Sequence, residues 1–99
     1  MSRFTVYVLP DAWREMKGLP GHMRHRVRRA VDELAEDAYP PRSIALHAAE
    51  VGVEVRRLRL DRWRIVYAVD EDNLTIDVLA VRKRPPYDYG DVEELLAQL

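Results

Sequence analysis

The order of apolar and polar residues predicts a strand and then a helical hairpin in the first half of the chain. Residues 4–9 are β-branched, aromatic or aliphatic and precede Pro10, which favours a strand. Asp11 is placed to cap a short helix over residues 12–17, which Gly18 ends. From His22 to Ala38 apolar side chains recur at helical spacing, so we expect a second helix with one buried stripe.

The second half of the chain has the pattern of three consecutive strands. Val55–Leu60, Trp63–Val69 and Leu74–Val81 are rich in β-branched and aromatic residues. Two polar turns, Asp61-Arg62 and residues 70–73, separate them. Such short turns join antiparallel strands, because parallel strands need a longer crossover.

The register of these strands predicts two faces of opposite character. One face is apolar and is expected to pack against the helices, whereas the other carries Arg57, Arg59 and Arg64. A slip of one residue would bury the arginines, so the pattern specifies the register. The predicted opposite pairs are Leu60–Trp63, Leu58–Ile65, Arg59–Arg64 and Arg57–Val66 across the first turn, and Tyr67–Ile76 and Ile65–Val78 across the second.

The remaining segments complete one domain over residues 1–99. Residues 42–52 are expected to form a loop with one helical turn around Ala45–Ala49. A short helix is expected from about Asp91, with Val92, Leu95, Leu96 and Leu99 on one side. The element order is then β-α-α-β-β-β-α. It predicts an α+β fold with a mainly antiparallel four-stranded sheet, a helical hairpin on one face and a short C-terminal helix.

Composition narrows the classes of protein to which the chain belongs. Its 99 residues contain no cysteine, which excludes disulfide scaffolds, cysteine-ligated metals and cysteine nucleophiles. No apolar run approaches the roughly 20 residues that span a membrane, and the first residues lead into a strand, not a signal peptide. The sequence therefore predicts a cytoplasmic protein without a membrane partner.

The net charge of −1 hides a local concentration of basic residues, eight of which lie between Arg56 and Arg84. Arg57, Arg59 and Arg64 on one sheet face, with Arg82-Lys83-Arg84 at the end of the next strand, repel one another. A ligand with phosphates would relieve this repulsion, because guanidinium groups match phosphate geometry. The alternative is a solvated face balanced by Asp61, Asp77 and the acidic C-terminal segment.

The second half of the chain resembles the RelE/ParE superfamily of bacterial toxin–antitoxin toxins. The resemblance rests on Arg57–Tyr67, above all the aromatic-Arg-aliphatic-Val-Tyr strand from Trp63 to Tyr67, and on Leu79–Arg84 with a following tyrosine. It implies a RelE-like fold, a cognate antitoxin as partner, and no cofactor. The activity that it favours is ribosome-dependent endonucleolytic cleavage of mRNA without a metal. The alternative is inhibition of DNA gyrase by a ParE-like toxin without nuclease activity.

The resemblance also implies site residues for the nuclease branch, in which the ribose 2′-hydroxyl attacks the neighbouring phosphate. Arg64 matches the phosphate-binding arginine and Arg84 the arginine that assists the leaving group. Lys83 is a possible base, since arginine stays protonated and strand parity places Lys83 beside the arginines. The RNA-binding positions implied are Arg57, Arg59, Arg82, and Tyr87 or Tyr89 as the base-stacking tyrosine.

The three histidines give a weaker alternative. His22, His25 and His47 are candidate bases, and His22 and His25 share one helix face. A metal site would need more ligands at suitable spacing, so no metal is predicted. Surface histidines in a basic segment are the favoured interpretation.

Overall fold

The sheet of the computed structural model has five strands, in the order β1-β5-β4-β3-β2. The structure describes residues 3–46 and 53–99. The strands are β1 (Thr5–Val8), β2 (Ser43–Ala45), β3 (Glu54–Leu60), β4 (Trp63–Asp70) and β5 (Thr75–Lys83), and the helices are α1 (Pro10–Lys17), α2 (Gly21–Glu33) and α3 (Val92–Leu96). β1 pairs with β5 in parallel, and the other neighbours are antiparallel. The α+β class and the predicted helices are confirmed, with one strand more than expected.

The additional strand is β2, which occupies part of the segment predicted as a loop. Ser43, Ile44 and Ala45 pair with Leu58, Arg57 and Arg56 of β3. The helical turn predicted around Ala45–Ala49 is therefore wrong at Ala45, and residues 47–52 lie outside the described residues. A three-residue strand gives too short an alternation to be recognised in a sequence.

Both helices of the hairpin begin or end a few residues away from the predicted positions. α1 starts at Pro10 with Leu9 as its N-cap, so the prediction of Asp11 as cap is wrong. Proline suits the first turn of a helix, because the N–H that it lacks would be unpaired there. α2 ends at Glu33, and the N–H groups of Leu34, Ala35 and Glu36 then donate to carbonyls three residues earlier, in tighter turns. The carbonyl of Ala35 accepts hydrogen bonds from the N–H groups of Arg3 and Phe4.

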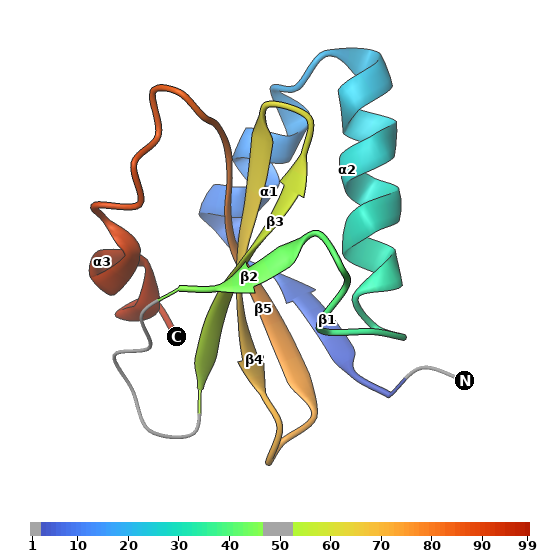
Figure 1. The fold of residues 1–99 in the computed structure, drawn as a ribbon, viewed down its shortest axis with the longest axis vertical. Coiled ribbons are helices and arrows are strands. Elements are labelled where there is room, and N and C mark those ends of the chain that lie inside the picture. Colours follow the sequence, from blue (N-terminus) through green and yellow to red (C-terminus); the bar gives the residue numbers. More distant parts are fainter. Residues whose placement is uncertain (1–2, 47–52) are drawn as a thin grey trace.

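Two cores lie on opposite faces of the sheet. α1 and α2 cover one face, and α3 lies across the sheet from them (Figure 1). The predicted apolar face packs against α1 and α2, and Tyr67 at its centre is fully buried and donates to the carbonyl of Ala38 at 2.8 Å. On the other face α3 covers a smaller core that includes Val55, Val66 and Leu79, and Leu99 beyond it is exposed.

The register of β3 and β4 is as predicted, but that of β4 and β5 is not. Tyr67 lies opposite Val78 and Ile65 opposite Val81, because the turn closes between Asp70 and Thr75 and a bulge follows at Val66/Tyr67. The side chain of Asp70 fixes this turn by accepting hydrogen bonds from the backbone N–H and the amide of Asn73. In the described part of the chain, no helix is long and apolar enough to cross a lipid bilayer.

Candidate functional site

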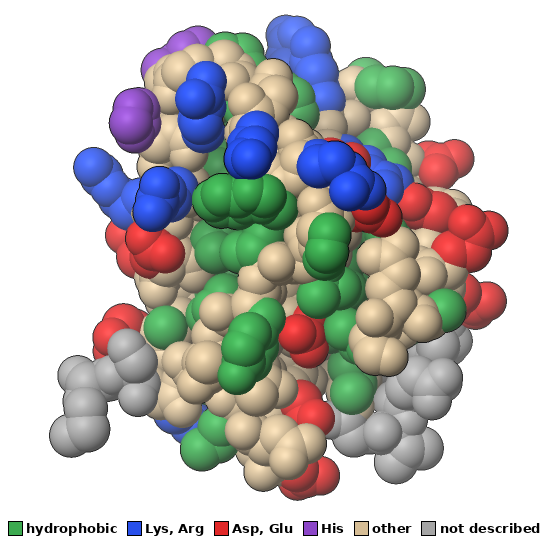
Figure 2. Space-filling model, turned by 180° about the vertical axis from the view of Figure 1, so that it is seen from behind, with side chains coloured by type: hydrophobic (Ala, Val, Ile, Leu, Met, Phe, Trp, Pro, Cys, Tyr) green, Lys and Arg blue, Asp and Glu red, His purple; other side chains and the backbone are tan. Residues whose placement is uncertain are grey.

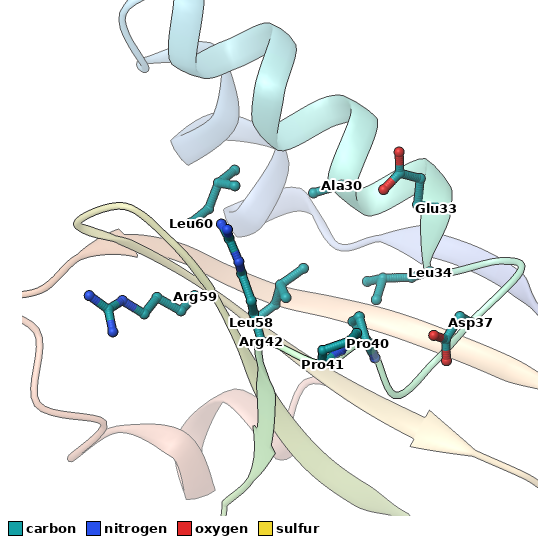
Figure 3. Close-up of a pocket in the computed structure, with 10 residues that line it drawn as sticks. All are labelled: Ala30, Glu33, Leu34, Asp37, Pro40, Pro41, Arg42, Leu58, Arg59 and Leu60. Carbon is teal, nitrogen blue, oxygen red and sulfur yellow. The ribbon is translucent and has the colours of Figure 1, made fainter.

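Three arginines lie side by side across the sheet. The register pairs Arg59 with Arg64 and Arg64 with Arg82, so β3, β4 and β5 each contribute one arginine. We call these three residues the arginine row. Arg42, just before β2, is the backbone neighbour of Arg59, because its carbonyl accepts a hydrogen bond from the N–H of Arg59 at 3.2 Å, but its side chain extends toward Leu60 on the other side of β3 (Figure 3). Neighbouring strands are about 4.8 Å apart and like charges facing each other destabilise a sheet, so this row needs compensation.

Two more arginines belong to the same face as the row. Arg57 lies two residues before Arg59 in β3, opposite Val66 of the α3-side core. Arg84 follows β5, where its N–H donates to the carbonyl of Arg62 at 2.7 Å and its guanidinium lies 5.1 Å from the ring centre of Tyr89. The prediction that Arg57, Arg59 and Arg64 share one face is confirmed, and the ring of Tyr89, against which Arg84 lies, rests on the α3-side core of that face.

Lys83 lies on the opposite face, so the parity prediction for it is wrong. It pairs with Trp63 and lines hollows beside His22, Met23 and Leu19 on the side of α1 and α2. The cause is the bulge at Val66/Tyr67, which adds one residue to β5 and exchanges the faces of Arg82 and Lys83. Figure 2 shows Lys, Arg and His side chains gathered toward one end of this helix-covered side.

Arg82 is neutralised by two carboxylates of the chain itself. Its guanidinium forms ion pairs with Glu15 of α1, at 2.7 Å, and with Asp91 at the start of α3. Burial alone would lower the pKa of Arg82, but the hydrogen bonds to Asp91 and Glu15 raise it above its ordinary value. Glu15 also accepts a hydrogen bond from the N–H of Val81 at 3.1 Å, beyond the end of β1 where the edge of β5 is unpaired.

The guanidinium of Arg64 is turned toward the hairpin between β3 and β4. Its Nη1 donates to the carbonyls of Asp61 and Trp63, both at 3.0 Å, and its buried Nε has no hydrogen-bond partner. No carboxylate in residues 3–46 or 53–99 forms an ion pair with Arg64, Arg57, Arg59 or Arg84. The row is therefore compensated at its β5 end and lacks carboxylate partners elsewhere.

The two tyrosines after β5 are half-buried, not exposed. Tyr87 and Tyr89 pack edge to face with ring centres 4.9 Å apart and rest against the α3-side core. The hydroxyl of Tyr87 donates to Asp91 at 2.6 Å, and its ring lies 4.9 Å from the guanidinium of Arg82. Burial and the hydrogen bond to Asp91 raise the pKa of Tyr87.

Three carboxylates near the row are already bound to arginines. Glu15 and Asp91 are bound to Arg82, and Asp61 at the hairpin turn is bound to Arg26 of α2. The ion pair with Arg26 lowers the pKa of Asp61, and the nearby charges of Arg42 and Arg59 lower it further.

Of the two described histidines, His22 lies near part of the basic set. His22 and His25 are exposed on α2, and His22 borders a hollow together with Arg59, Arg62 and Lys83. His47 falls outside the described residues. The described residues contain no group of three or more His, Asp or Glu side chains that could hold a metal ion.

Arg42 is the site residue that the sequence did not indicate. It stands in the segment read as a loop, without an alternating pattern around it. It borders a hollow of about 500 Å³ with Arg57 and Arg59 and, on its other side, an apolar groove of about 440 Å³ between α2 and β3. The pairing of Ser43 with Leu58 puts Arg42 beside Arg59, and only the existence of β2 reveals that neighbourhood.

The fold is that of the RelE toxins. One similar structure is an archaeal RelE–RelB complex from Pyrococcus horikoshii, with 20% identity, a TM-score of 0.77, and coverage of 86% of this chain and 99% of that chain. A second is the RelBE2 toxin–antitoxin complex from Mycobacterium tuberculosis, with 22% identity, a TM-score of 0.69, and coverage of 83% and 99%. A third is the isolated RelE toxin of E. coli, with 17% identity, a TM-score of 0.62, and coverage of 96% and 97%.

The sequence defines the family more closely than the fold does. Residues 6–85 match the model of the ParE toxin of the type II toxin–antitoxin system parDE. The chain therefore belongs to the ParE toxin family, within the RelE/ParE superfamily. A comparison with curated proteins gave no match.

Proposed function

We propose that this toxin acts as a ParE-like inhibitor that binds DNA gyrase and blocks supercoiling without cutting RNA. The observation that carries the proposal is the pairing of Lys83 with Trp63, which places Lys83 on the helix side of the sheet and not on the face of Arg57 and Arg64. Lys83 was the candidate base that the sequence favoured over the histidines. Membership of the ParE family supports the same choice.

Cleavage of RNA by the ribose 2′-hydroxyl needs a group that accepts the proton of that hydroxyl. Arginine does not release its proton in the range where proteins function, so the row itself supplies no base. The three carboxylates nearest the row are held in ion pairs with Arg82 and Arg26. The arginines on this face could thus stabilise the charge of a phosphate, whereas these three carboxylates are poor proton acceptors because each is already bound to an arginine.

The proposed partner in the cell is a cognate antitoxin, and the proposed place of action is the cytoplasm, where gyrase works. Two of the similar structures, from P. horikoshii and M. tuberculosis, are toxin–antitoxin complexes. Arg57, Arg59 and Arg84 have no carboxylate partner in the described residues. An antitoxin segment that binds over them is therefore expected to carry acidic residues.

The deciding experiment measures supercoiling and RNA cleavage with the same preparation. We expect the purified toxin to stop ATP-dependent supercoiling by gyrase, and co-purified antitoxin to restore it. Relaxation by a topoisomerase of another class is the control and should be unaffected. The proposal would be refuted if a toxin that stops growth when it is expressed leaves supercoiling by purified gyrase unchanged, even in excess over the enzyme.

Ribosome-dependent cleavage of mRNA is the second candidate, favoured by Arg57, Arg59, Arg64 and Arg84 on one face. It predicts transcripts cut in phase with codons by primer extension after induction. Arg64→Ala and Arg84→Ala would then both abolish toxicity and the cuts without loss of fold. Within this candidate function, Lys83→Ala tests the identity of the base, since cleavage should persist if Lys83 is not the base.

A further inference from the structure

The outer side of β1 is an open edge of the sheet (Figure 1). On its inner side the N–H of Thr5 donates to the carbonyl of Leu74 at 2.9 Å, and the N–H of Leu9 donates to the carbonyl of Val78 at 3.1 Å. Successive residues of a strand direct their backbone groups to alternate sides, so Val6 and Val8 point theirs away from β5. Within the described part of the chain, the N–H and C=O groups of Val6 and Val8 have no hydrogen-bond partner.

This open edge is limited at both ends. The N–H of Phe4, which also points outward, donates to the carbonyl of Ala35 at 3.0 Å. At the other end Pro10, two residues after Val8, has no N–H to offer and begins α1. The N–H groups available to a neighbouring strand are therefore those of Val6 and Val8.

β1 lacks the features that usually protect an edge strand from pairing with another molecule. Such strands are commonly protected by charged side chains, by proline or by a covering segment. Where β5 extends past β1, protection of this kind exists, because Glu15 accepts a hydrogen bond from the N–H of Val81 at 3.1 Å. The four residues of β1, Thr-Val-Tyr-Val, carry no charge, and Tyr7 is 53% exposed.

We propose that two copies of this chain associate through β1, as an antiparallel pair of strands with Tyr7 on the twofold axis. In this register Val6 of one copy lies opposite Val8 of the other, and each such pair exchanges two hydrogen bonds. All the free N–H groups of the two edges are then bonded to carbonyls of the same residues. The symmetric registers with Val6 or Val8 on the axis would need the N–H of Phe4 or of Pro10, which is already bonded in the first case and absent in the second.

The side chains of β1 suit the same register. Tyr7 lies opposite Tyr7 of the second copy in a pair without hydrogen bonds, where side chains are closest, so two exposed rings cover each other. Val6 and Val8 remain packed against the core of their own copy. Because donors, acceptors and rings all match under one twofold axis, the edge fits a second copy better than an unrelated strand.

The association is reversible, because a pair of four-residue strands buries less surface than a permanent dimer needs. The inference is independent of the proposed action on gyrase, since it concerns the edge of β1 and is tested without gyrase.

Single cysteines test the register directly, because the chain contains none. Tyr7→Cys places two Cα atoms about 4.5 Å apart across the axis, which a disulfide can bridge. Thr5→Cys lies exposed on the same face of β1, but its two copies would be about 14 Å apart. During oxidation with copper–phenanthroline we expect Tyr7→Cys to form a covalent dimer at least tenfold faster than Thr5→Cys. Equal rates would overturn the proposal, because random collisions do not distinguish the two positions.

Sedimentation equilibrium tests the association without a crosslink. We expect the mean mass of the wild-type protein to rise with concentration from 11.6 kDa toward twice that value. Tyr7→Lys sets two ammonium groups opposite each other and should keep the protein monomeric. Ile44→Lys is the matched control, because Ile44 is 49% exposed on β2 at the opposite edge of the sheet, and it should associate like the wild type.

Two results of the sedimentation experiment would overturn the proposal. The first is a wild-type protein that stays monomeric at about 1 mM, where even a weak dimer forms. The second is loss of association in Ile44→Lys but not in Tyr7→Lys, which would assign the contact to β2. Circular dichroism of each variant confirms that the fold is retained.

Discussion

Asp91 links the C-terminal helix to the sheet through a charge, and its neutralisation should weaken the fold in a pH-dependent way. Its carboxylate accepts hydrogen bonds from Arg82 and from the hydroxyl of Tyr87, and its side chain is 30% exposed. In Asp91→Asn the amide keeps the shape but loses the charge-assisted contact with Arg82. Such contacts contribute roughly 1.5–3 kcal/mol, and partial exposure reduces that to about 1–2 kcal/mol.

The sign of the pH dependence follows from the pKa of Asp91. Burial would raise this pKa, but the hydrogen bonds from Tyr87 and Arg82 lower it below its ordinary value. A carboxylate with a lowered pKa in the folded state stabilises the fold above the unfolded pKa of about 3.9, and this contribution disappears as the pH falls through the folded pKa. The wild-type protein should therefore exceed Asp91→Asn in stability at pH 7 and approach it below about pH 4.

Urea unfolding followed by tryptophan fluorescence measures both the loss of stability at pH 7 and its dependence on pH. At pH 7 we expect a loss of about 1–2 kcal/mol, or roughly 4–16 °C in melting temperature for a domain of this size. Glu94→Gln, an exposed carboxylate on the same helix, is the matched control and should cost much less. A stability difference that stays constant from pH 7 to pH 3 would refute the reasoning, because a neutral contact would then account for it.

Three further substitutions test other parts of the fold. Tyr67→Phe removes the hydrogen bond to the Ala38 carbonyl and should cost about 0.5–1.5 kcal/mol in urea unfolding; no loss would mean that water replaces the hydroxyl. Glu15→Ala leaves Arg82 with one carboxylate and frees the N–H of Val81, so faster amide exchange at Val81 is expected, and unchanged exchange would contradict the role of Glu15. Burial and the hydrogen bond to Glu71 raise the pKa of Tyr39 to about 12, so Tyr39 stays protonated at pH 10. The phenolate absorbance at pH 10 should therefore be the same in Tyr39→Phe as in the wild type, and a clear loss of that absorbance would contradict the raised pKa.

Local signals in the sequence were sufficient for the hairpin of β3 and β4. The two-residue turn and the alternation of Leu58, Leu60 and Ile65 with arginines fix both faces, and the observed pairs are those predicted. The same reasoning failed across β4 and β5, because the extra residue of a bulge leaves no mark in the pattern of apolar residues. The extra residue of the bulge decides on which face of the sheet Arg82 and Lys83 lie.

Contacts between distant segments were beyond the reach of the sequence. The pairing of Arg82 with Glu15 joins positions 67 apart, and β1 was not assigned a neighbour. Trp13 was not recognisable as a surface residue either; it is 42% exposed because α1 buries Ala12 and Met16 instead, and the ammonium of Lys17 lies 5.5 Å from the centre of its ring.

The parallel pairing of β1 with β5 has a consequence for the folding of the chain during its synthesis. Thr5 pairs with Thr75 and Val8 pairs with Val78. β1 is synthesised first, but it has no neighbouring strand until β5, the last strand, has been synthesised. Closing so long a loop is slow compared with forming helices or hairpins. Since Arg82 also belongs to β5, the row of cations is assembled only after β5 has been synthesised and has paired with β4.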